Sequence, residues 1–213
     1  TPDHLDARVK LGRMYEQGRG VKKDVNAASW WYERAAEHGH ADAQFHQGRL
    51  YEQKQGDHRF LHDYKAAVKW YTRAAEQGHT GAQFLLALMY ERGEGVPKDD
   101  KAGVKWYTRA AEGGHAFSQF LIGLRYANGK GVPQDDKLAV KWHTRAAENG
   151  QAGSQLELSK MYEQGKGIPQ DNVYALMWRK IVASSGGIYV KEARETNALL
   201  EKLMKPPQIA RAQ

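Results

Sequence analysis

The tryptophans recur at a fixed interval along the chain, and this period limits the possible folds more than any other feature. Trp70, Trp106, Trp142 and Trp178 are spaced 36 residues apart, and Trp31 lies 39 residues before Trp70. A second series keeps the same rhythm: Tyr15, Tyr51, Tyr90, Tyr126 and Tyr162. A fixed period of roughly 20 to 50 residues is typical of stacked structural repeats rather than of one folded core. We therefore expect five repeats that follow one another without a linker.

Each repeat is expected to form two helices joined by a tight loop. In the third repeat, residues 82–90 are good helix formers, and two glycines and a proline within residues 93–97 stop this helix. A second helix is predicted from near Asp99 to Glu112. Because a single hairpin cannot bury its apolar face, the hairpins must stack on one another. The pattern therefore predicts an all-α solenoid in which the tryptophans and tyrosines fill the space between hairpins.

The consensus of the repeats resembles a known family. Its pattern, A-Q-F-x-x-x-x-x-Y-E-x-G-x-G-V-P-x-D-x-x-x-A-x-x-W-Y-x-R-A-A-E-x-G-H, is similar to the Sel-one-like repeat, a relative of the tetratricopeptide repeat, and extends from about Ala7 to Gly187. The resemblance implies a right-handed superhelical solenoid of about five antiparallel helix-turn-helix repeats of 36–39 residues, whose first helices line a concave surface. It also implies an adaptor for other proteins, without catalytic activity.

We expect a single solenoid domain over residues 1–213. Its repeats are predicted to span about 4–39, 40–78, 79–114, 115–150 and 151–187, and a C-terminal cap is predicted over 188–213. The cap is expected to contain a helix from about Tyr189 to Met204, with Leu199 and Leu203 on one face. The segment 206–210 that follows resembles the closing segment of some family members, so we expect the C-terminus to be natural.

Three repeats depart from the pattern. The second repeat has Lys54-Gln-Gly-Asp-His58 in place of the G-x-G-V-P loop and carries three extra residues, which predicts a longer and more mobile loop. The fourth repeat places Arg125 at a position that is apolar in the other repeats, so this charge must reach solvent or a carboxylate. The fifth repeat replaces the R-A-A-E signature with Ile181-Val-Ala-Ser184, as expected where the stacking changes to accept a cap.

Composition restricts the remaining choices. The chain has no cysteine, which excludes disulfides and thiolate metal sites, and no run of about 20 apolar residues that a membrane helix requires. The formal net charge of +7 favours an acidic partner such as nucleic acid, anionic lipid or an acidic protein surface. The compartment stays open, because bacterial periplasmic, secreted and cytoplasmic locations all fit, and the oligomeric state is not predicted.

Several residues suggest chemistry, but each fits a structural role better. His40, His79 and His115 recur at the repeat junctions, and stacked helices place equivalent positions about 8–10 Å apart, too far for one metal ion. His58 and His62 are four residues apart, without an obvious third ligand. The Gly-x-Gly loops join two helices, whereas a phosphate-binding loop follows a strand. We therefore predict no catalytic residues, no metal and no cofactor.

A basic stripe is predicted on the second helices of three repeats, where cations recur at i, i+4 and i+8. Its members are Lys65, Lys69, Arg73, Lys101, Lys105, Arg109, Lys137, Lys141 and Arg145. A glutamate follows each arginine by three residues and neutralises part of this charge. The stripe is interpreted as a solvated outer face, with an electrostatic contact as the alternative. Nucleic acid is disfavoured as the partner, because the aromatic residues occupy periodic positions expected to be core.

The first helices differ at two positions that lie three residues apart and share a face. These positions are polar in the first, second and fifth repeats, but the third and fourth repeats carry the leucines Leu85, Leu88, Leu121 and Leu124. An apolar patch with a polar rim is typical of a partner site. The predicted rim consists of Arg49, Arg92, Arg125, Asn128, Glu157 and Lys160. The alternative is that these leucines pack against an adjoining helix.

Three hypotheses for function follow. The first is a non-catalytic scaffold that binds a protein or peptide segment in a concave groove centred on the third and fourth repeats. The second is a binder of an anionic ligand, which uses the basic outer face and weakens steeply with salt. The third is an accessory arm of a larger protein.

Overall fold

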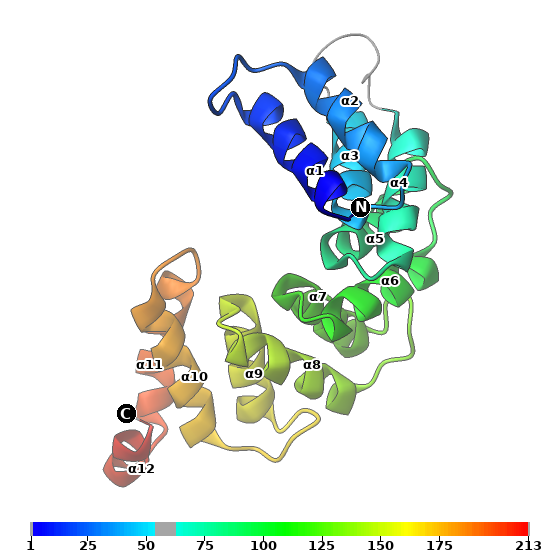
Figure 1. The fold of residues 1–213 in the computed structure, drawn as a ribbon. Helices are drawn as coiled ribbons and strands as arrows, with labels where there is room; N and C mark the ends of the chain where they lie inside the picture. Colours follow the sequence, from blue (N-terminus) through cyan, green and yellow to red (C-terminus); the bar gives the residue numbers. More distant parts are fainter. Residues whose placement is uncertain (1, 54–62, 213) are drawn as a thin grey trace. The chain divides into compact units, whose positions relative to one another are not determined.

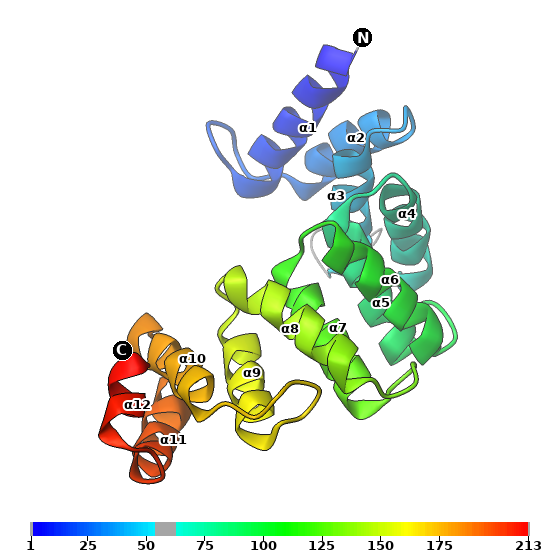
Figure 2. The same cartoon turned by 90° about the horizontal axis from the view of Figure 1, so that it is seen from below.

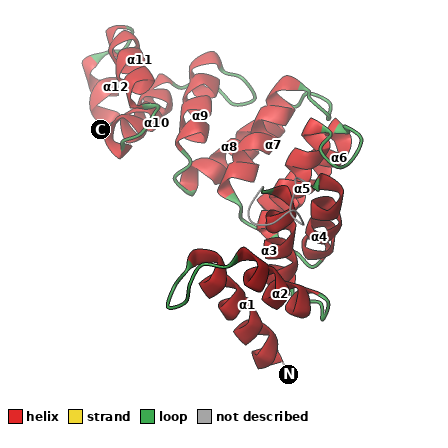
Figure 3. Cartoon of the chain, turned by 90° about the horizontal axis from the view of Figure 1, so that it is seen from above, coloured by secondary structure: helices red, strands yellow, loops and turns green. Residues whose placement is uncertain are grey.

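The computed structural model describes residues 2–53 and 63–212, and these residues form twelve helices and no strand (Figures 1 and 3). The insertion in the second repeat, with His58 and His62, lies outside the described residues. The described chain divides into two compact units, Thr1–Gly113 and Gly114–Gln213. The expected all-α architecture is confirmed. The single solenoid domain over the whole chain stays a prediction, and the two units are described separately below.

The first unit contains three helical hairpins that follow one another in the chain. Its helices are α1 (Pro2–Gln17), α2 (Val25–Ala36), α3 (Ala41–Glu52), α4 (Tyr64–Glu76), α5 (Thr80–Arg92) and α6 (Asp100–Glu112). The two helices of each hairpin pack on one another, and α2 and α4 also pack against the first helix of the next hairpin (Figures 1 and 2). Each helix therefore contacts its neighbours in sequence, as expected for stacked repeats.

The second unit contains two further hairpins and the C-terminal cap. Its helices are α7 (Ala116–Asn128), α8 (Asp136–Glu148), α9 (Ala152–Gln164), α10 (Asn172–Ser185), α11 (Val190–Lys202) and α12 (Pro206–Arg211). Helix α8 packs against both α7 and α9, and α10 packs against α9, α11 and α12. Figure 2 shows α11 and α12 beside α10 at the end of this unit. Helices α7 and α9, both first helices of a hairpin, also contact each other across α8, which separates them in sequence.

The repeat motif fixes the helix ends. In the third repeat, Asp99 is the N-cap of α6, and its carboxylate accepts hydrogen bonds from the N–H groups of Lys101 and Ala102. Gly93 ends α5 in the left-handed conformation, with φ of 74°. The second glycine of the loop, Gly95, also has positive φ, and an added Cβ there would lie 2.3 Å from the carbonyl oxygen of Tyr64. The G-x-G sequence thus both turns the chain and lets the loop lie against the N-terminus of α4.

The glutamine of the A-Q motif joins consecutive hairpins. The buried side-chain amide of Gln44 on α3 donates a hydrogen bond to the carbonyl oxygen of Ala36 at the end of α2, at 3.0 Å. Gln83 and Gln155 make the equivalent bonds to the carbonyl oxygens of Ala75 and Ala147, at 3.0 and 3.1 Å. These carbonyls belong to the last turn of a helix, and each also accepts a hydrogen bond from the N–H of the glycine three residues later. The motif therefore satisfies a helix end and fixes the stacking together.

The core consists of small and aromatic residues at the repeat period. The alanine pairs of the R-A-A-E signature are buried, and Tyr32, Tyr71 and Tyr107 have almost no exposed surface. The tryptophans are buried less than expected, since Trp142 is 7% exposed whereas Trp70 and Trp106 are only partly buried. In the first three repeats, the tyrosine after the tryptophan therefore fills the interior, and the tryptophan lies at the edge of the core.

The C-terminal cap does not pack through the face that contains Leu199 and Leu203. Ala193, Leu200 and Met204 are buried against α10, whereas Leu199 and Leu203 are 62% and 76% exposed. The predicted helix is present, and it is followed by the short helix α12, which the sequence did not indicate because it begins with two prolines. Both prolines lie in the first turn of α12, where proline costs no backbone hydrogen bond.

Candidate partner-binding surface

The leucines singled out in the sequence are neither fully buried nor fully exposed. Leu85 and Leu88 lie on α5 in the first unit, and Leu121 and Leu124 lie on α7 in the second; all four are partly buried. Their neighbours Leu86 and Ile122 form the core and have no exposed surface. The expected single patch of four leucines would join the two units, and it stays a prediction.

In the first unit, two arginines of the predicted rim differ in exposure. Arg49 near the end of α3 is partly buried, whereas the side chain of Arg92 at the end of α5 is 58% exposed. The Arg92 guanidinium lies 3.8 Å from a carboxylate oxygen of Glu94 in the following loop. An exposed ion pair at this distance contributes little to stability, about 0–1 kcal/mol, so Arg92 can exchange this partner at small cost.

In the second unit, Leu121 and Leu124 line a hollow of about 210 Å³ together with Arg125, Asn128 and Lys130. Arg125 replaces an apolar residue of the other repeats, and its side chain reaches the edge of this hollow and is only partly buried. Two leucines and three polar side chains thus share one concave surface along α7. The combination of apolar anchors and a polar rim suits a bound side chain of a partner.

A second hollow of about 150 Å³ lies between α7 and α9. Its lining residues are Leu124, Ala127, Asn128, His143, Glu157, Lys160, Met161, Gln164 and Lys166. The ammonium group of Lys160 lies 3.1 Å from Glu157 and 3.3 Å from Glu192 on α11. Burial lowers the pKa of Lys160, but the two carboxylates outweigh it and raise this pKa above its ordinary value. The rim on α9 is therefore an ordered ion-pair network.

The nine cations of the predicted basic stripe are all exposed, three each on α4 and α6 in the first unit and three on α8 in the second. Each of the three arginines lies over the ring of the tryptophan three residues earlier on its own helix, with the guanidinium carbon of Arg73 4.9 Å from the Trp70 ring centroid. The distances for Arg109 and Arg145 are 4.8 and 5.1 Å. These cation–π contacts were not expected from the sequence, although the W-x-x-R spacing indicates them.

The histidines at the repeat junctions cap helices, so the structural interpretation holds for them. His40, His79 and His115 are the N-caps of α3, α5 and α7, and the ring Nδ1 of each accepts a backbone N–H three residues later. Gln151 does the same for α9. Among residues 2–53 and 63–212, no three histidine, cysteine, aspartate or glutamate side chains are grouped as metal ligands would be.

A buried pair links the two helices of most hairpins, and sequence reasoning missed it. The hydroxyl groups of Tyr32 and Tyr71 donate hydrogen bonds to Glu16 and Glu52, at 2.7 and 2.5 Å. Burial, together with the nearby carboxylate, raises the pKa of both tyrosines. The third repeat has the same pair, Tyr107 with Glu91 at 3.1 Å, and in the fifth the guanidinium of Arg179 pairs with Glu163.

The fourth repeat lacks both members of this pair. Ala127 stands at the glutamate position, and His143 stands at the tyrosine position. The His143 ring has no exposed surface, its Nδ1 lies 3.2 Å from the hydroxyl of Ser154, and its Nε2 has no hydrogen-bond partner. Burial lowers the pKa of His143 to about 4, so the ring is neutral at pH 7. The signal was present in the sequence as the dipeptides Tyr126-Ala127 and Trp142-His143, which interrupt the Y-E and W-Y patterns.

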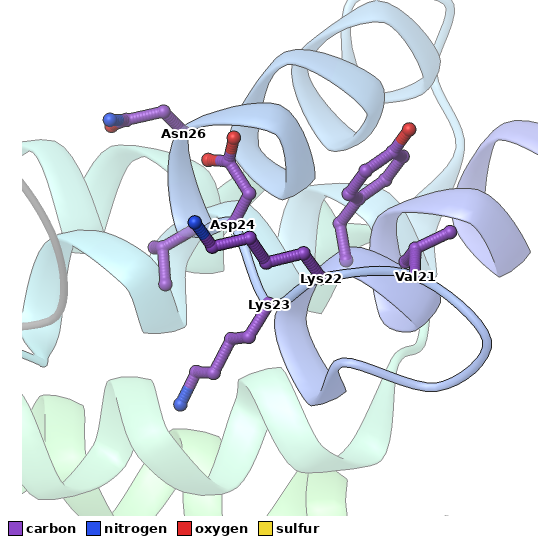
Figure 4. A pocket seen from close by; sticks show the side chains of 7 residues that line it. Val21, Lys22, Lys23, Asp24 and Asn26 are labelled. Carbon is purple, nitrogen blue, oxygen red and sulfur yellow. The ribbon is translucent and has the colours of Figure 1, made fainter.

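Another hollow belongs to the first hairpin and not to the predicted surface. It has a volume of about 790 Å³ and lies beside the loop between α1 and α2, where Val21, Lys22, Lys23, Asp24 and Asn26 line it (Figure 4). Figure 4 shows Lys22 and Lys23 extending in different directions from the loop. Asp24 is the N-cap of α2, so its carboxylate is used by the backbone. The lining therefore presents no convergent set of polar groups.

Five stacked helical hairpins with a C-terminal capping helix define the chain as an α-solenoid repeat protein. The family model of the Sel1 repeat matches residues 5–40, 41–79, 80–115, 116–151 and 152–180. The chain belongs to the Sel1 repeat family, which confirms both the resemblance and the expected solenoid class.

Solved structures agree with this assignment. The chain is similar to a Sel1 repeat protein from Oxalobacter formigenes, with a TM-score of 0.81 and 38% identity over 90% of this chain and 79% of that chain. It is also similar to c5321, a protective antigen of uropathogenic Escherichia coli strains with an SLR fold, with a TM-score of 0.80 and 31% identity. That match covers 98% of this chain but 44% of the antigen, so the chain spans less than half of the antigen's length. A comparison with curated protein sequences gave no match.

The described helices also bear on membrane insertion. Among residues 2–53 and 63–212, none of the helices combines the length and apolar character that crossing a bilayer requires.

Proposed function

We propose that the protein is a non-catalytic scaffold that binds a segment of another protein on the concave face formed by its first helices. Sel1 repeat proteins are in general scaffolds for protein–protein interaction, and they are typically non-catalytic. The observation that supports the proposal most directly is the hollow on α7, where Leu121 and Leu124 are accessible beside Arg125 and Asn128. In the first unit, a second partner contact is proposed at Leu85 and Leu88 on α5, with Arg49 and Arg92.

A bound segment would gain affinity on this surface mainly by covering its leucines. A partly exposed leucine gains about 25 cal/mol for each Å² of apolar surface that a partner covers. Arginine is enriched in protein interfaces, because its side chain combines an apolar stem with several hydrogen-bond donors. Arg125 beside the leucines can contribute in this way. The hollow on α7 therefore suits an apolar side chain of the partner, which would contact the two leucines. A hydrogen-bond acceptor next to that side chain would bind Arg125.

The test is affinity capture from the source organism with the wild-type chain and the variants Leu85→Lys and Leu121→Lys, singly and combined. Leu199→Lys is the matched control, because this leucine is 62% exposed and lies on α11, which carries no residue of the proposed surface. Circular dichroism first establishes that all four variants are as helical as the wild type. A partner that survives Leu199→Lys and is lost with the combined variant supports the proposal.

The captured partner is then purified, and its Kd is measured for each single variant. We expect each lysine substitution to weaken binding at least tenfold, since it places a charge at an apolar contact. Equal affinity for the wild type and the combined variant would contradict the proposed surface.

A second candidate function uses the basic stripe, because all nine of its cations are exposed. An acidic protein, nucleic acid or anionic lipid surface would bind there through charge. The affinity of a polyanion would fall steeply between 50 and 200 mM salt as counterions compete, as in nucleic-acid binding. A Kd that changes little over this range, or that does not respond to Lys101→Glu and Lys137→Glu, would exclude this function.

A further inference from the structure

The fourth repeat differs from the others at one buried position that faces a hollow. In the first, second, third and fifth repeats, a glutamate on the first helix accepts a hydrogen bond from a buried side chain on the second helix. In the fourth repeat the glutamate is replaced by Ala127, and the tyrosine is replaced by the shorter ring of His143. Both replacements remove volume at the same place, and both residues line the hollow of about 150 Å³ between α7 and α9.

The imidazole of His143 is held in a defined position with one atom left unsatisfied. Gly123 lies against the ring, since a Cβ added to this glycine would be 2.7–2.8 Å from three ring atoms. Ser154 occupies Nδ1, at 3.2 Å from its hydroxyl oxygen. When the Ser154 hydroxyl donates to Nδ1, the proton of the neutral ring resides on Nε2, and that N–H lacks an acceptor. A buried donor without an acceptor is destabilising, and an added acceptor would recover this cost.

The lining of the hollow fits a short acidic side chain. Leu124, Ala127 and Met161 provide an apolar wall for methylene groups. Asn128, Lys160 and Lys166 provide donors for a carboxylate.

The other charges around this hollow are ion-paired. Lys160 is paired with Glu157 and Glu192, and Lys166 lies 3.3 Å from Asp136. Glu157 is the one carboxylate in the lining, and its pairing with Lys160 reduces its repulsion of an incoming anion.

We propose that this hollow binds a glutamate side chain of the partner, whose carboxylate accepts the hydrogen bond from His143 Nε2 and replaces the glutamate that the chain supplies in its other repeats. The inference rests on the proposed function, because the partner segment brings the glutamate to the surface beside Leu121 and Leu124. His143 Nε2 is covered in this structure, so a lining side chain must shift when the carboxylate enters. Met161 is suited to this, since its unbranched thioether adopts several rotamers at low cost.

The experiment uses N-acetyl-glutamate amide as the probe and N-acetyl-glutamine amide as its uncharged match. The whole chain is labelled with ¹⁵N, and the imidazole nitrogens of His143 are followed by NMR during titration at pH 7. We expect a saturable shift of the Nε2 resonance with the glutamate probe, with a Kd in the millimolar range, and a shift at least tenfold weaker with the glutamine probe. The same titration with propionate separates a glutamate residue from a free carboxylate.

The variant Ala127→Glu tests the site from within the chain. The introduced carboxylate is expected to occupy the hollow, to shift the Nε2 resonance without any probe, and to abolish the response to the glutamate probe. Ala116→Glu, at the first residue of α7, is the control and is expected to leave the response unchanged.

Each remaining outcome contradicts the proposal. No shift with the glutamate probe, an equal shift with the glutamine probe, or an undiminished shift in Ala127→Glu would overturn the site. A response to propionate alone would show that the site takes a free carboxylate and not a partner's glutamate. These outcomes are distinct from failure of the proposed function, because the probes need no macromolecular partner, whereas the leucine variants measure partner binding directly.

Discussion

At the scale of single residues, the buried tyrosine–glutamate pairs hold the two helices of a hairpin together. The hydroxyl of Tyr71 has no exposed surface and donates to Glu52 at 2.5 Å, so removing it leaves a partly buried carboxylate without this donor. We predict that Tyr71→Phe lowers the free energy of unfolding by about 1–3 kcal/mol, the range for a hydrogen bond to a charged group. Urea denaturation measures the change. Tyr174→Phe is the control, because this ring is 49% exposed, and its effect should be near zero.

The histidine of the fourth repeat makes stability depend on pH. Burial lowers the pKa of His143 from 6.5 to about 4, so between these values the unfolded chain binds a proton that the folded chain does not. The free energy of unfolding should therefore fall as pH is lowered from 6.5 towards 4, by up to about 3 kcal/mol from this residue. His46, whose pKa burial also lowers to about 4, contributes in the same direction.

A substitution isolates the contribution of His143. The charged groups that line the hollow beside it are Glu157, Lys160 and Lys166. We predict that His143→Gln, which cannot take up the proton, reduces the fall in stability between pH 6.5 and 4.5 by about 2 kcal/mol. Urea denaturation at each pH measures this, with the exposed His38→Gln as control. An unchanged pH dependence in His143→Gln would show that the ring is protonated in the folded chain.

Residues also show how far the sequence could predict the site. The leucine pairs could be found because the sequence itself shows the change from polar to apolar residues at two equivalent positions of the repeats. The changes to Ala127 and His143 are also visible in the sequence, but the hollow between them is not, because the two residues lie 16 residues apart and only the hairpin geometry brings them together. The degree of burial of Trp70 was misjudged for a related reason, since the ring lies at the edge of the core and is covered by Arg73.

At the scale of helices and loops, glycines control how closely consecutive hairpins approach. Gly95 and Gly78 both have positive φ, 73° and 88°, but only Gly95 has another backbone within contact distance of an added Cβ. We predict that Gly78→Ala costs about 1 kcal/mol, from the left-handed conformation alone. Gly95→Ala should cost at least about 2 kcal/mol more, because the loop must move away from Tyr64. Thermal and urea denaturation compare the two, and equal costs would contradict the close approach.

Helix boundaries were the easiest elements to predict. Aspartate N-caps and left-handed glycines are local signals, so the second helix of the third repeat was expected from near Asp99 and begins at Asp100. The face through which the cap packs could not be predicted from local sequence signals. Helix α11 buries Ala193 and Leu200 and leaves Leu199 exposed, and Met204 rather than Leu203 is buried just after the helix. This choice depends on how α11 is rotated against α10.

At the scale of the whole chain, the two compact units and the sequential contacts predict uneven stability. In a stack where each helix packs mainly on its neighbours, stability is a sum of repeat and interface terms, and a local lesion need not unfold the rest. Trp142 on α8 is 7% exposed, so Trp142→Ala should cost about 3–5 kcal/mol within its own unit. Hydrogen exchange followed by mass spectrometry measures the effect segment by segment.

In Trp142→Ala, we expect the exchange rates of the amides of α7, α8 and α9 to rise by about two orders of magnitude or more. This rise corresponds to the loss of about 3–5 kcal/mol, since a factor of ten equals about 1.4 kcal/mol. The amides of α1 to α4 should keep their wild-type rates, because these helices lie in the other compact unit. Ala116→Glu, the control at the start of α7, separates a loss of core packing from a simple change of surface charge. Equal loss of protection in all helices would show that the chain unfolds as one cooperative body.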